Sequence, residues 1–203
     1  MHEVPTPEGP ARAHVHAVPD AVGALVLGHG AGGGVTAPDL VAATTTALEL
    51  GVSVVLVEQP YRVAGRRRPD PAPRLDAAWE AVVAWVGAEV APGLPVVTGG
   101  RSSGARVACR TAVTTGAVGV LCLAFPMLPP PRRDGSRGPS RLPELDGVGV
   151  PVLVVQGERD PYGMPPDSPG RRVVRTPGDH ALRGGLPPLR NALAAWLRDV
   201  LPI

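Results

Sequence analysis

Short hydrophobic runs recur along the chain, and each is followed by glycine or another turn-forming residue. The runs are rich in Val and Leu, and polar residues do not alternate with the apolar ones. Near-continuous hydrophobicity of this kind is typical of strands that are covered on both faces, as in parallel sheets. On this basis we predict buried strands at residues 23–28, 52–57, 95–98, 118–124 and 151–156.

Between these runs, apolar residues recur with helical spacing. The pattern predicts helices over about 38–50, 73–90, 103–115 and 187–200. Weaker patterns predict an edge strand within 10–18 and a last short strand at 171–176. The alternation of strands and helices therefore predicts an α/β fold with a doubly wound, mostly parallel sheet.

The proline- and arginine-rich segment 126–147 is the longest stretch without a regular pattern. We predict that it is a loop over the carboxyl end of the sheet and not a linker, because 203 residues fit a single domain, spanning 1–203. No insertion before Asp160 is long enough for a helical cap. We therefore expect a minimal fold with an open site.

Composition narrows the classes of partner. Aromatic residues make up only 3% of the chain, so the core is expected to consist of Val, Leu and Ala. The net charge of +2 is too small to indicate a nucleic-acid partner. In the absence of a long apolar stretch or a signal-peptide core, we expect no membrane partner and a cytoplasmic location. Cys109 and Cys122 lack metal-site spacing, so we expect buried thiols, no metal and no cofactor.

The most informative motif is Gly100-Arg101-Ser102-Ser103-Gly104, which follows a predicted strand and opens a predicted helix. G-x-S-x-G in this setting is typical of a nucleophile elbow, where a tight turn presents a serine above the sheet. A flexible Gly/Ser turn or a phosphate loop is the competing interpretation. The chain contains no lysine, which argues against a phosphate loop of the P-loop type. Ser102 is therefore the candidate nucleophile.

A second glycine-rich segment, residues 28–34, follows the first predicted buried strand. It resembles a dinucleotide fingerprint with Glu49 or Glu58 as the acid, but that interpretation leaves the elbow unexplained. We favour an oxyanion loop, in which backbone N–H groups of Ala31 and Ser103 bind a developing negative charge. Gly32 is the alternative to Ala31, and His29 is expected to be structural.

The remaining partners of a serine nucleophile follow it in the order acid, then histidine. Asp160 lies just beyond the predicted strand at 151–156, with Glu158 as the alternative acid. His180 is the only histidine after residue 29, so it is the candidate base.

Taken together, these residues resemble the α/β-hydrolases of the dienelactone-hydrolase-like kind. More narrowly, the chain resembles the hydrolase-like domain of the testis-expressed and histone-acetyltransferase-complex subunit group and its bacterial relatives. The matching segments are HGAGG at 29–33, EQPYRVAGRR at 58–67, GGRSSGAR at 99–106, AFPMLPP at 124–130, VQGERDPYG at 155–163 and GDH at 178–180. The resemblance implies a Ser–Asp–His triad at Ser102, Asp160 and His180. Ser103 departs from the bulky apolar residue that is more usual there.

The sequence therefore predicts a serine hydrolase whose small-molecule acyl substrate is a carboxylic ester or thioester. The alternative is a non-catalytic interaction module that keeps the hydrolase fold. Tyr61, Arg62, Phe125 and Met127 follow predicted strands and are candidates for the pocket wall, with a structural role equally open for each. The substrate and the oligomeric state stay open.

Overall fold

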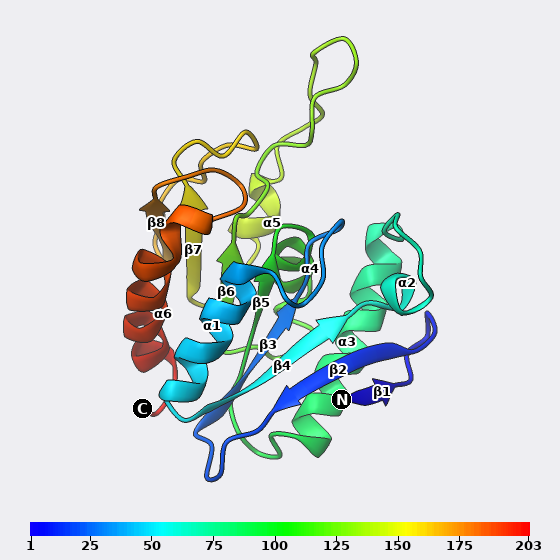
Figure 1. Cartoon of the computed structure of the whole chain (residues 1–203), viewed down its shortest axis with the longest axis vertical. Helices are drawn as coiled ribbons and strands as arrows, with labels where there is room; N and C mark the ends of the chain where they lie inside the picture. The colour runs from blue at the N-terminus through cyan, green and yellow to red at the C-terminus, as the bar shows by residue number, and fades with distance from the viewer.

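An eight-stranded sheet runs through the computed structural model, which describes all residues from 1 to 203 (Figure 1). The strands are β1 (His2–Val4), β2 (Ala11–His16), β3 (Gly23–Gly28), β4 (Val52–Glu58), β5 (Val96–Arg101), β6 (Gly119–Leu123), β7 (Val152–Gly157) and β8 (Arg171–Thr176). Their order in the sheet is β1-β2-β4-β3-β5-β6-β7-β8. The pairs β1–β2 and β2–β4 are antiparallel and all other neighbouring strands are parallel, which confirms the predicted α/β fold with a mostly parallel sheet.

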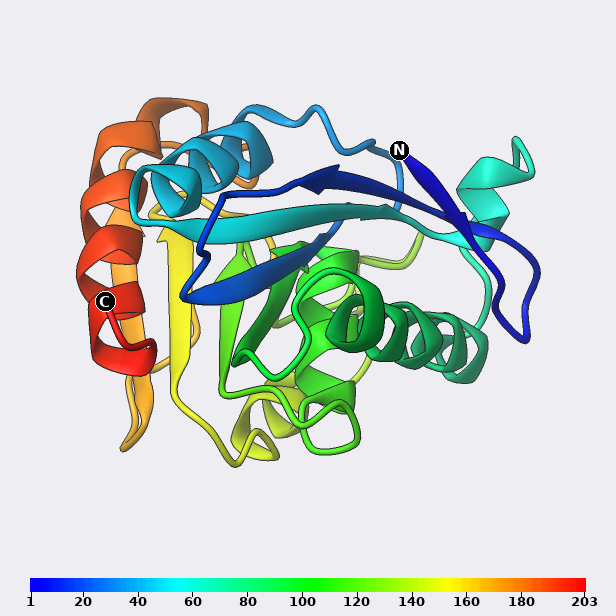
Figure 2. The ribbon, with the colours of Figure 1, turned by 90° about the horizontal axis from the view of Figure 1, so that it is seen from below.

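Helices cover both faces of this sheet. The helical segments are α1 (Pro38–Glu49), α2 (Pro60–Val63), α3 (Ala72–Glu89), α4 (Ser103–Thr111), α5 (Leu142–Asp146), the 3₁₀ turn η1 (Arg183–Gly185) and α6 (Leu186–Val200). Alternate strand residues point to opposite faces, so Leu25 packs beneath α1 and α6, whereas Val26 packs beneath α3 and α4. Figure 2 shows the two layers on either side of the sheet. None of the helices combines the length and hydrophobicity that a membrane crossing requires.

The structure differs from the predicted elements mainly in short segments. Strand β5 continues beyond the predicted end at Thr98, because Gly99 and Gly100 still pair with β3 and β6. The segment 126–147 was expected to be a loop throughout, but its last part forms α5, where Leu145 is buried against the core. Five residues are too few to show a helical period, which is why the pattern did not indicate this helix.

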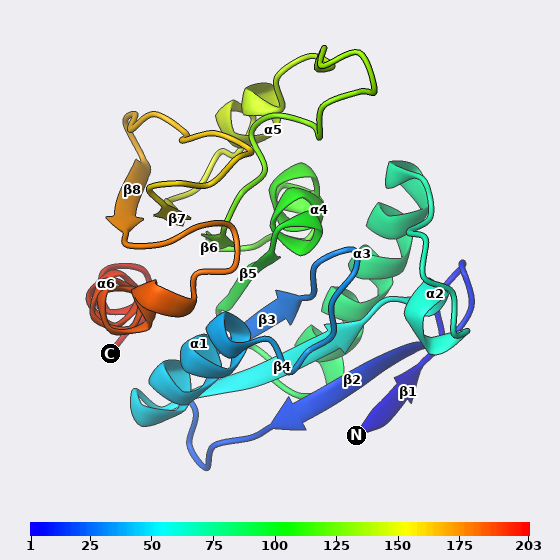
Figure 3. The same ribbon diagram turned by 45° about the horizontal axis from the view of Figure 1, so that its top comes forward.

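The carboxyl ends of the parallel strands lie at one edge of the sheet. The loops that follow β3, β7 and β8 and the start of α4 meet there, as Figure 3 shows with this edge turned forward. In open parallel sheets, this edge is where ligands bind. Ala31, Ser102, Ser103, Asp160 and His180 all belong to these loops or to the start of α4.

Candidate active site

The turn between β5 and α4 places Ser102 at the carboxyl edge of the sheet. Ser102 has φ 52° and ψ −106°, a conformation that side-chain-bearing residues rarely adopt. Its N–H donates to the carbonyl of Leu123 at 2.9 Å, which ties the turn to β6. A side chain at Gly100 or Gly104 would collide with the backbone carbonyl of Gly28. The two glycines of the motif therefore allow the close approach that exposes the serine hydroxyl.

Ser102, His180 and Asp160 form a hydrogen-bonded triad, although they come from three separate loops. The Ser102 Oγ lies 2.9 Å from His180 Nε2, and His180 Nδ1 lies 2.8 Å from Asp160 Oδ2. The carboxylate can only accept, so Nδ1 carries the proton and Nε2 accepts from the serine hydroxyl. This is the tautomer that a histidine needs in order to remove a proton from serine.

The carboxylate of Asp160 is held on both oxygens. Its side chain is only 1% exposed, Oδ1 accepts the N–H of Tyr162 at 2.9 Å, and Oδ2 lies 2.9 Å from Gln156 Nε2. The ring of Tyr162 also packs edge-on against the His180 imidazole. Glu158, the alternative acid, is exposed and its carboxylate makes no hydrogen bond. The structure therefore brings Asp160, and not Glu158, to His180.

Ala31 and Ser103 lie in the same pocket wall as Ser102. Neither backbone N–H donates a hydrogen bond within the protein, and Ser103 is the first residue of α4, where N–H groups have no partner in the helix. The Tyr61 hydroxyl donates to the carbonyl of Ala31 at 3.1 Å and so fixes the Ala31–Gly32 peptide. The peptide that carries the Ala31 N–H is held through the Gly30 carbonyl, which accepts from His29 Nδ1 at 2.8 Å. Burial raises the pKa of Tyr61 to about 12, which keeps this donor protonated. Two donors are thus available where an oxyanion would form.

His29 lies beneath this loop and uses both of its ring nitrogens on the backbone. Nδ1 donates to the carbonyl of Gly30 at 2.8 Å, and Nε2 accepts the N–H of Gln59 at 3.2 Å. The residue is 3% exposed, and burial lowers the pKa of His29 so that the neutral ring is favoured. Glu49 and Glu58, the acids of the dinucleotide interpretation, do not line the pocket.

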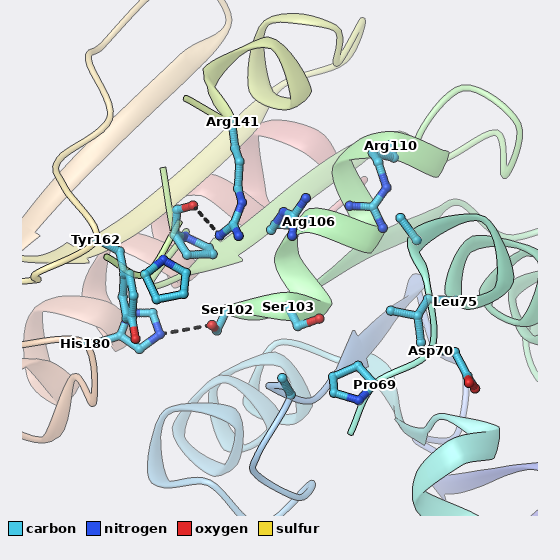
Figure 4. Close-up of a pocket in the computed structure, with 14 residues that line it drawn as sticks. Pro69, Asp70, Leu75, Ser102, Ser103, Arg106, Arg110, Arg141, Tyr162 and His180 are labelled. Atoms are coloured by element: carbon cyan, nitrogen blue, oxygen red, sulfur yellow. Dashed lines mark hydrogen bonds between the residues drawn. The ribbon is translucent and has the colours of Figure 1, made fainter. Parts of the chain in front are cut away.

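The pocket beside Ser102 has a volume of about 290 Å³, and its lining is more charged than the sequence indicated (Figure 4). It is lined by Ala31, Pro69, Asp70, Ala72, Leu75, Ser102, Ser103, Arg106, Arg110, Pro126, Pro130, Arg141, Tyr162 and His180. The segment 126–147 thus contributes Pro126, Pro130 and Arg141 to the wall. Sequence reasoning missed the three arginines and Tyr162. The only signal for Arg106 was its position one helical turn after Ser102.

The four residues suggested for the pocket wall do not line it, so that suggestion is wrong. Phe125 is fully buried in the core, and Met127 packs against the same core. Tyr61 lies under the loop at Ala31, and Arg62 follows it on α2, outside the pocket. Position after a strand predicts nearness to the sheet edge, but it does not predict which way a side chain turns.

Arg101, the residue before the serine, links three parts of the site. Its Nε lies 2.9 Å from Asp39 Oδ2 on α1, and its Nη2 donates to the carbonyl of His180 at 2.9 Å. Asp39 is completely buried, and burial raises the pKa of its carboxyl while the Arg101 charge opposes this effect. The ion pair therefore anchors the loop that carries His180.

Comparison with known proteins agrees with this fold. A family model described as an alpha/beta hydrolase domain matches residues 21–174. No curated protein sequence matches the chain at a significant level.

Several solved structures share the fold at low sequence identity. A lidless α/β serine hydrolase from Xanthomonas campestris has a TM-score of 0.77 and 22% identity, over 100% of this chain and 94% of that one. Est1E from Butyrivibrio proteoclasticus, solved with ferulic acid bound, has a TM-score of 0.78 and 15% identity, over 98% and 99% of the two chains. A dienelactone hydrolase from Anabaena variabilis has a TM-score of 0.76 and 18% identity, over 98% and 96%. At these identities, the likeness shows the fold.

Proposed function

The chain belongs to the alpha/beta hydrolase domain family, and from this premise we propose that it is a serine hydrolase that cleaves carboxylic esters or thioesters. The observation that carries the proposal is the hydrogen-bonded line from Ser102 Oγ through His180 to Asp160, in which Ser102 and His180 line the pocket. A nucleophile, a base and a group that orients the base are what acyl transfer through a serine requires.

In the proposed reaction, Ser102 Oγ attacks the substrate carbonyl carbon while its proton passes to His180 Nε2. The negative charge on the carbonyl oxygen is bound by the N–H groups of Ala31 and Ser103. When the tetrahedral intermediate collapses, His180 gives the proton to the departing alcohol or thiol, and the acyl group stays on Ser102. A water molecule, deprotonated by the same imidazole, then releases the carboxylic acid and restores the serine.

The shape of the site supports small or accessible acyl substrates. No inserted domain covers the carboxyl edge of the sheet, and the pocket volume is about 290 Å³. The lidless relative from Xanthomonas campestris has the same overall architecture. We therefore propose short acyl chains and not long ones, because long apolar chains need an enclosed tunnel to be removed from water.

The alternative is an interaction module that has kept the fold without the chemistry, a role that the resemblance to subunits of histone-acetyltransferase complexes suggests. Segments 58–67 and 124–130 carry that resemblance. The intact triad favours hydrolysis, because a module without catalysis has no need to keep a strained serine at φ 52°.

Hydrolysis of 4-nitrophenyl acetate tests the proposal. We expect turnover by the wild-type protein and a loss on the order of 10³-fold or more in Ser102→Ala, since a triad acts as a unit. Ser136→Ala, in an exposed loop away from the pocket, is the matched control and should keep wild-type turnover. Full activity in Ser102→Ala would place the nucleophile elsewhere, with Ser103 as the first candidate. A folded wild-type protein without turnover would favour the interaction module.

A further inference from the structure

Three arginines line one side of the pocket beside Ser102, and two of them are neutralised. Arg106 binds Glu144 through Nε at 2.8 Å and Nη2 at 2.5 Å. Arg110 binds Asp76 through Nε at 2.8 Å and Nη2 at 2.6 Å. Both ion pairs hold α4 against its neighbours, and each acid cancels one positive charge.

Arg141, the third arginine, forms no ion pair. Its Nη1 donates to the carbonyl of Pro126 at 3.1 Å, which leaves the other guanidinium N–H groups without a protein acceptor. Its backbone N–H donates to the carbonyl of Met127 at 2.8 Å, so the residue is anchored at both ends. In Figure 4 the side chain extends from above toward Ser102, with His180 on the left of the pocket and Asp70 on the right.

The charge at Arg141 is therefore not balanced within the pocket. Burial and the nearby Arg106 lower the pKa of Arg141, yet a guanidinium stays protonated in proteins. The one acid in the pocket wall, Asp70, is bound on both oxygens by Arg66, at 2.6 and 2.8 Å. The carboxylates bound to this group of three arginines are those of Glu144 and Asp76 only, which leaves one excess positive charge in the pocket that Ser102 also lines.

We infer that Arg141 binds a carboxylate carried by the acyl part of the substrate. The inference rests on the proposed hydrolase function and names its substrate class: esters of dicarboxylic acids that keep one free carboxylate. A planar guanidinium with unused N–H groups matches a carboxylate in geometry, and one excess charge matches a monoanion better than a phosphate dianion. The half-buried position strengthens the attraction relative to open solvent.

A purely structural role is the competing explanation, because Arg141 also ties the end of the 126–147 segment to Pro126. Loss of that tie would lower activity on every ester alike. Recognition of a carboxylate, by contrast, changes the ratio between a charged ester and a neutral ester of the same shape. The ratio of the two kcat/KM values therefore separates recognition from structure.

The experiment compares 4-nitrophenyl hydrogen adipate with 4-nitrophenyl 6-methylheptanoate, in which an isopropyl group replaces the carboxylate. We expect the wild-type protein to prefer the charged ester by roughly tenfold or more in kcat/KM, mainly through KM. Arg141→Gln should abolish the preference, and Arg141→Lys should restore part of it. Arg133→Gln removes the same charge from an exposed position outside the pocket and should leave the ratio unchanged.

Binding of adipate to the Ser102→Ala protein, measured by calorimetry, separates the inference from the proposed function. Saturable binding that Arg141→Gln abolishes supports the site even if no ester is hydrolysed. Equal kcat/KM for the two esters in the wild type, or adipate binding that is unchanged by Arg141→Gln, would overturn the inference and leave the hydrolase proposal in place. Equal loss on both esters in Arg141→Gln would show that the residue is only structural.

Discussion

Two loops at the carboxyl edge of the sheet each carry a histidine, and the two side chains have different surroundings. In residues 29–34, after β3, both ring nitrogens of His29 contact backbone groups. In residues 177–182, after β8, the ring of His180 lies between a carboxylate and a hydroxyl. A histidine side chain thus holds the backbone in place in the first loop and is a candidate base in the second. Its partners decide which.

Burial adds a second difference between the two loops. His29 is 3% exposed, and a second ring proton would point at the N–H of Gln59. The His180 side chain is 20% exposed and faces the pocket, and Asp160 lies beside it to stabilise a positive charge. Only the second ring can take up a proton and release it again without breaking a hydrogen bond to the backbone.

Substitution of each histidine should separate the two roles most strongly. His180→Gln removes the acceptor for the serine proton, and we expect kcat for 4-nitrophenyl acetate to fall by 10⁴-fold or more. His29→Asn removes only a support of the oxyanion loop. The kcat calculated per folded molecule should therefore stay close to the wild-type value. Steady-state kinetics on both variants, with circular dichroism to count folded protein, makes the comparison. Equal losses in the two variants would refute the division of roles.

Substitution of Asp160 tests whether the carboxylate beside His180 is what distinguishes this histidine from His29. Asp160→Asn keeps the shape but favours the wrong histidine tautomer, and we expect a loss of about 10³- to 10⁴-fold in kcat. Glu158→Gln changes an exposed carboxylate without hydrogen-bond partners and serves as the matched control. The measurement is again kcat on the acetate ester. A larger effect at Glu158 would move the acid to that residue.

Arg101 joins the two loops, since it lies against Gly30 and donates to the carbonyl of His180. Arg101→Gln leaves the buried carboxylate of Asp39 without its cation, which costs about 3 kcal/mol in the free energy of unfolding. We also expect kcat to fall by roughly tenfold, because the His180 loop loses its anchor. Urea unfolding and kinetics measure the two effects.

The double variant Arg101→Gln with Asp39→Asn is the control for the Arg101 prediction. It removes the buried charge as well, so most of the lost stability should return while the kinetic defect stays. If activity returned together with stability, Arg101 would have no positioning role.

The smallest expected effect concerns pH. Burial lowers the pKa of His29 in the folded protein. When the pH falls below the pKa of about 6.5 that the residue has in the unfolded chain, the unfolded chain therefore binds a proton that the folded chain does not bind. The free energy of unfolding should therefore fall as the pH drops from 7 to 5, by about 1 kcal/mol from this residue. His29→Asn should show a shallower decline in urea unfolding over that range. An unchanged slope would mean that His29 binds a proton equally well in the folded and the unfolded chain.

Much of the architecture could be predicted from sequence because periodicity reports burial directly. The strands at 23–28 and 171–176 match the structure at both ends, and the alternation of strands and helices indicated the parallel sheet. Short elements such as α2 and α5 carry too few residues for a period, so tertiary packing decides them.

For the site, the motif and the chain order indicated Ser102, Asp160 and His180, which the structure places within hydrogen-bond distance; their roles stay predictions. Arg101 and Arg141 could not be predicted in this way. Arg101 matters because of its contacts with Asp39 and His180, which lie 62 or more positions away in the sequence. Arg141 matters because it has no ion-pair partner. Local sequence patterns indicate neither feature.

Reaction with a fluorophosphonate probe tests the central claim, that His180 activates Ser102, most directly. The probe forms a covalent bond with a serine only when its hydroxyl is activated by a base. We predict that mass spectrometry finds the label on Ser102 in the wild-type protein, no label in Ser102→Ala and strongly slowed labelling in His180→Gln, while His29→Asn still reacts. A folded wild-type protein without label, or a label on another serine that persists in Ser102→Ala, would contradict the account.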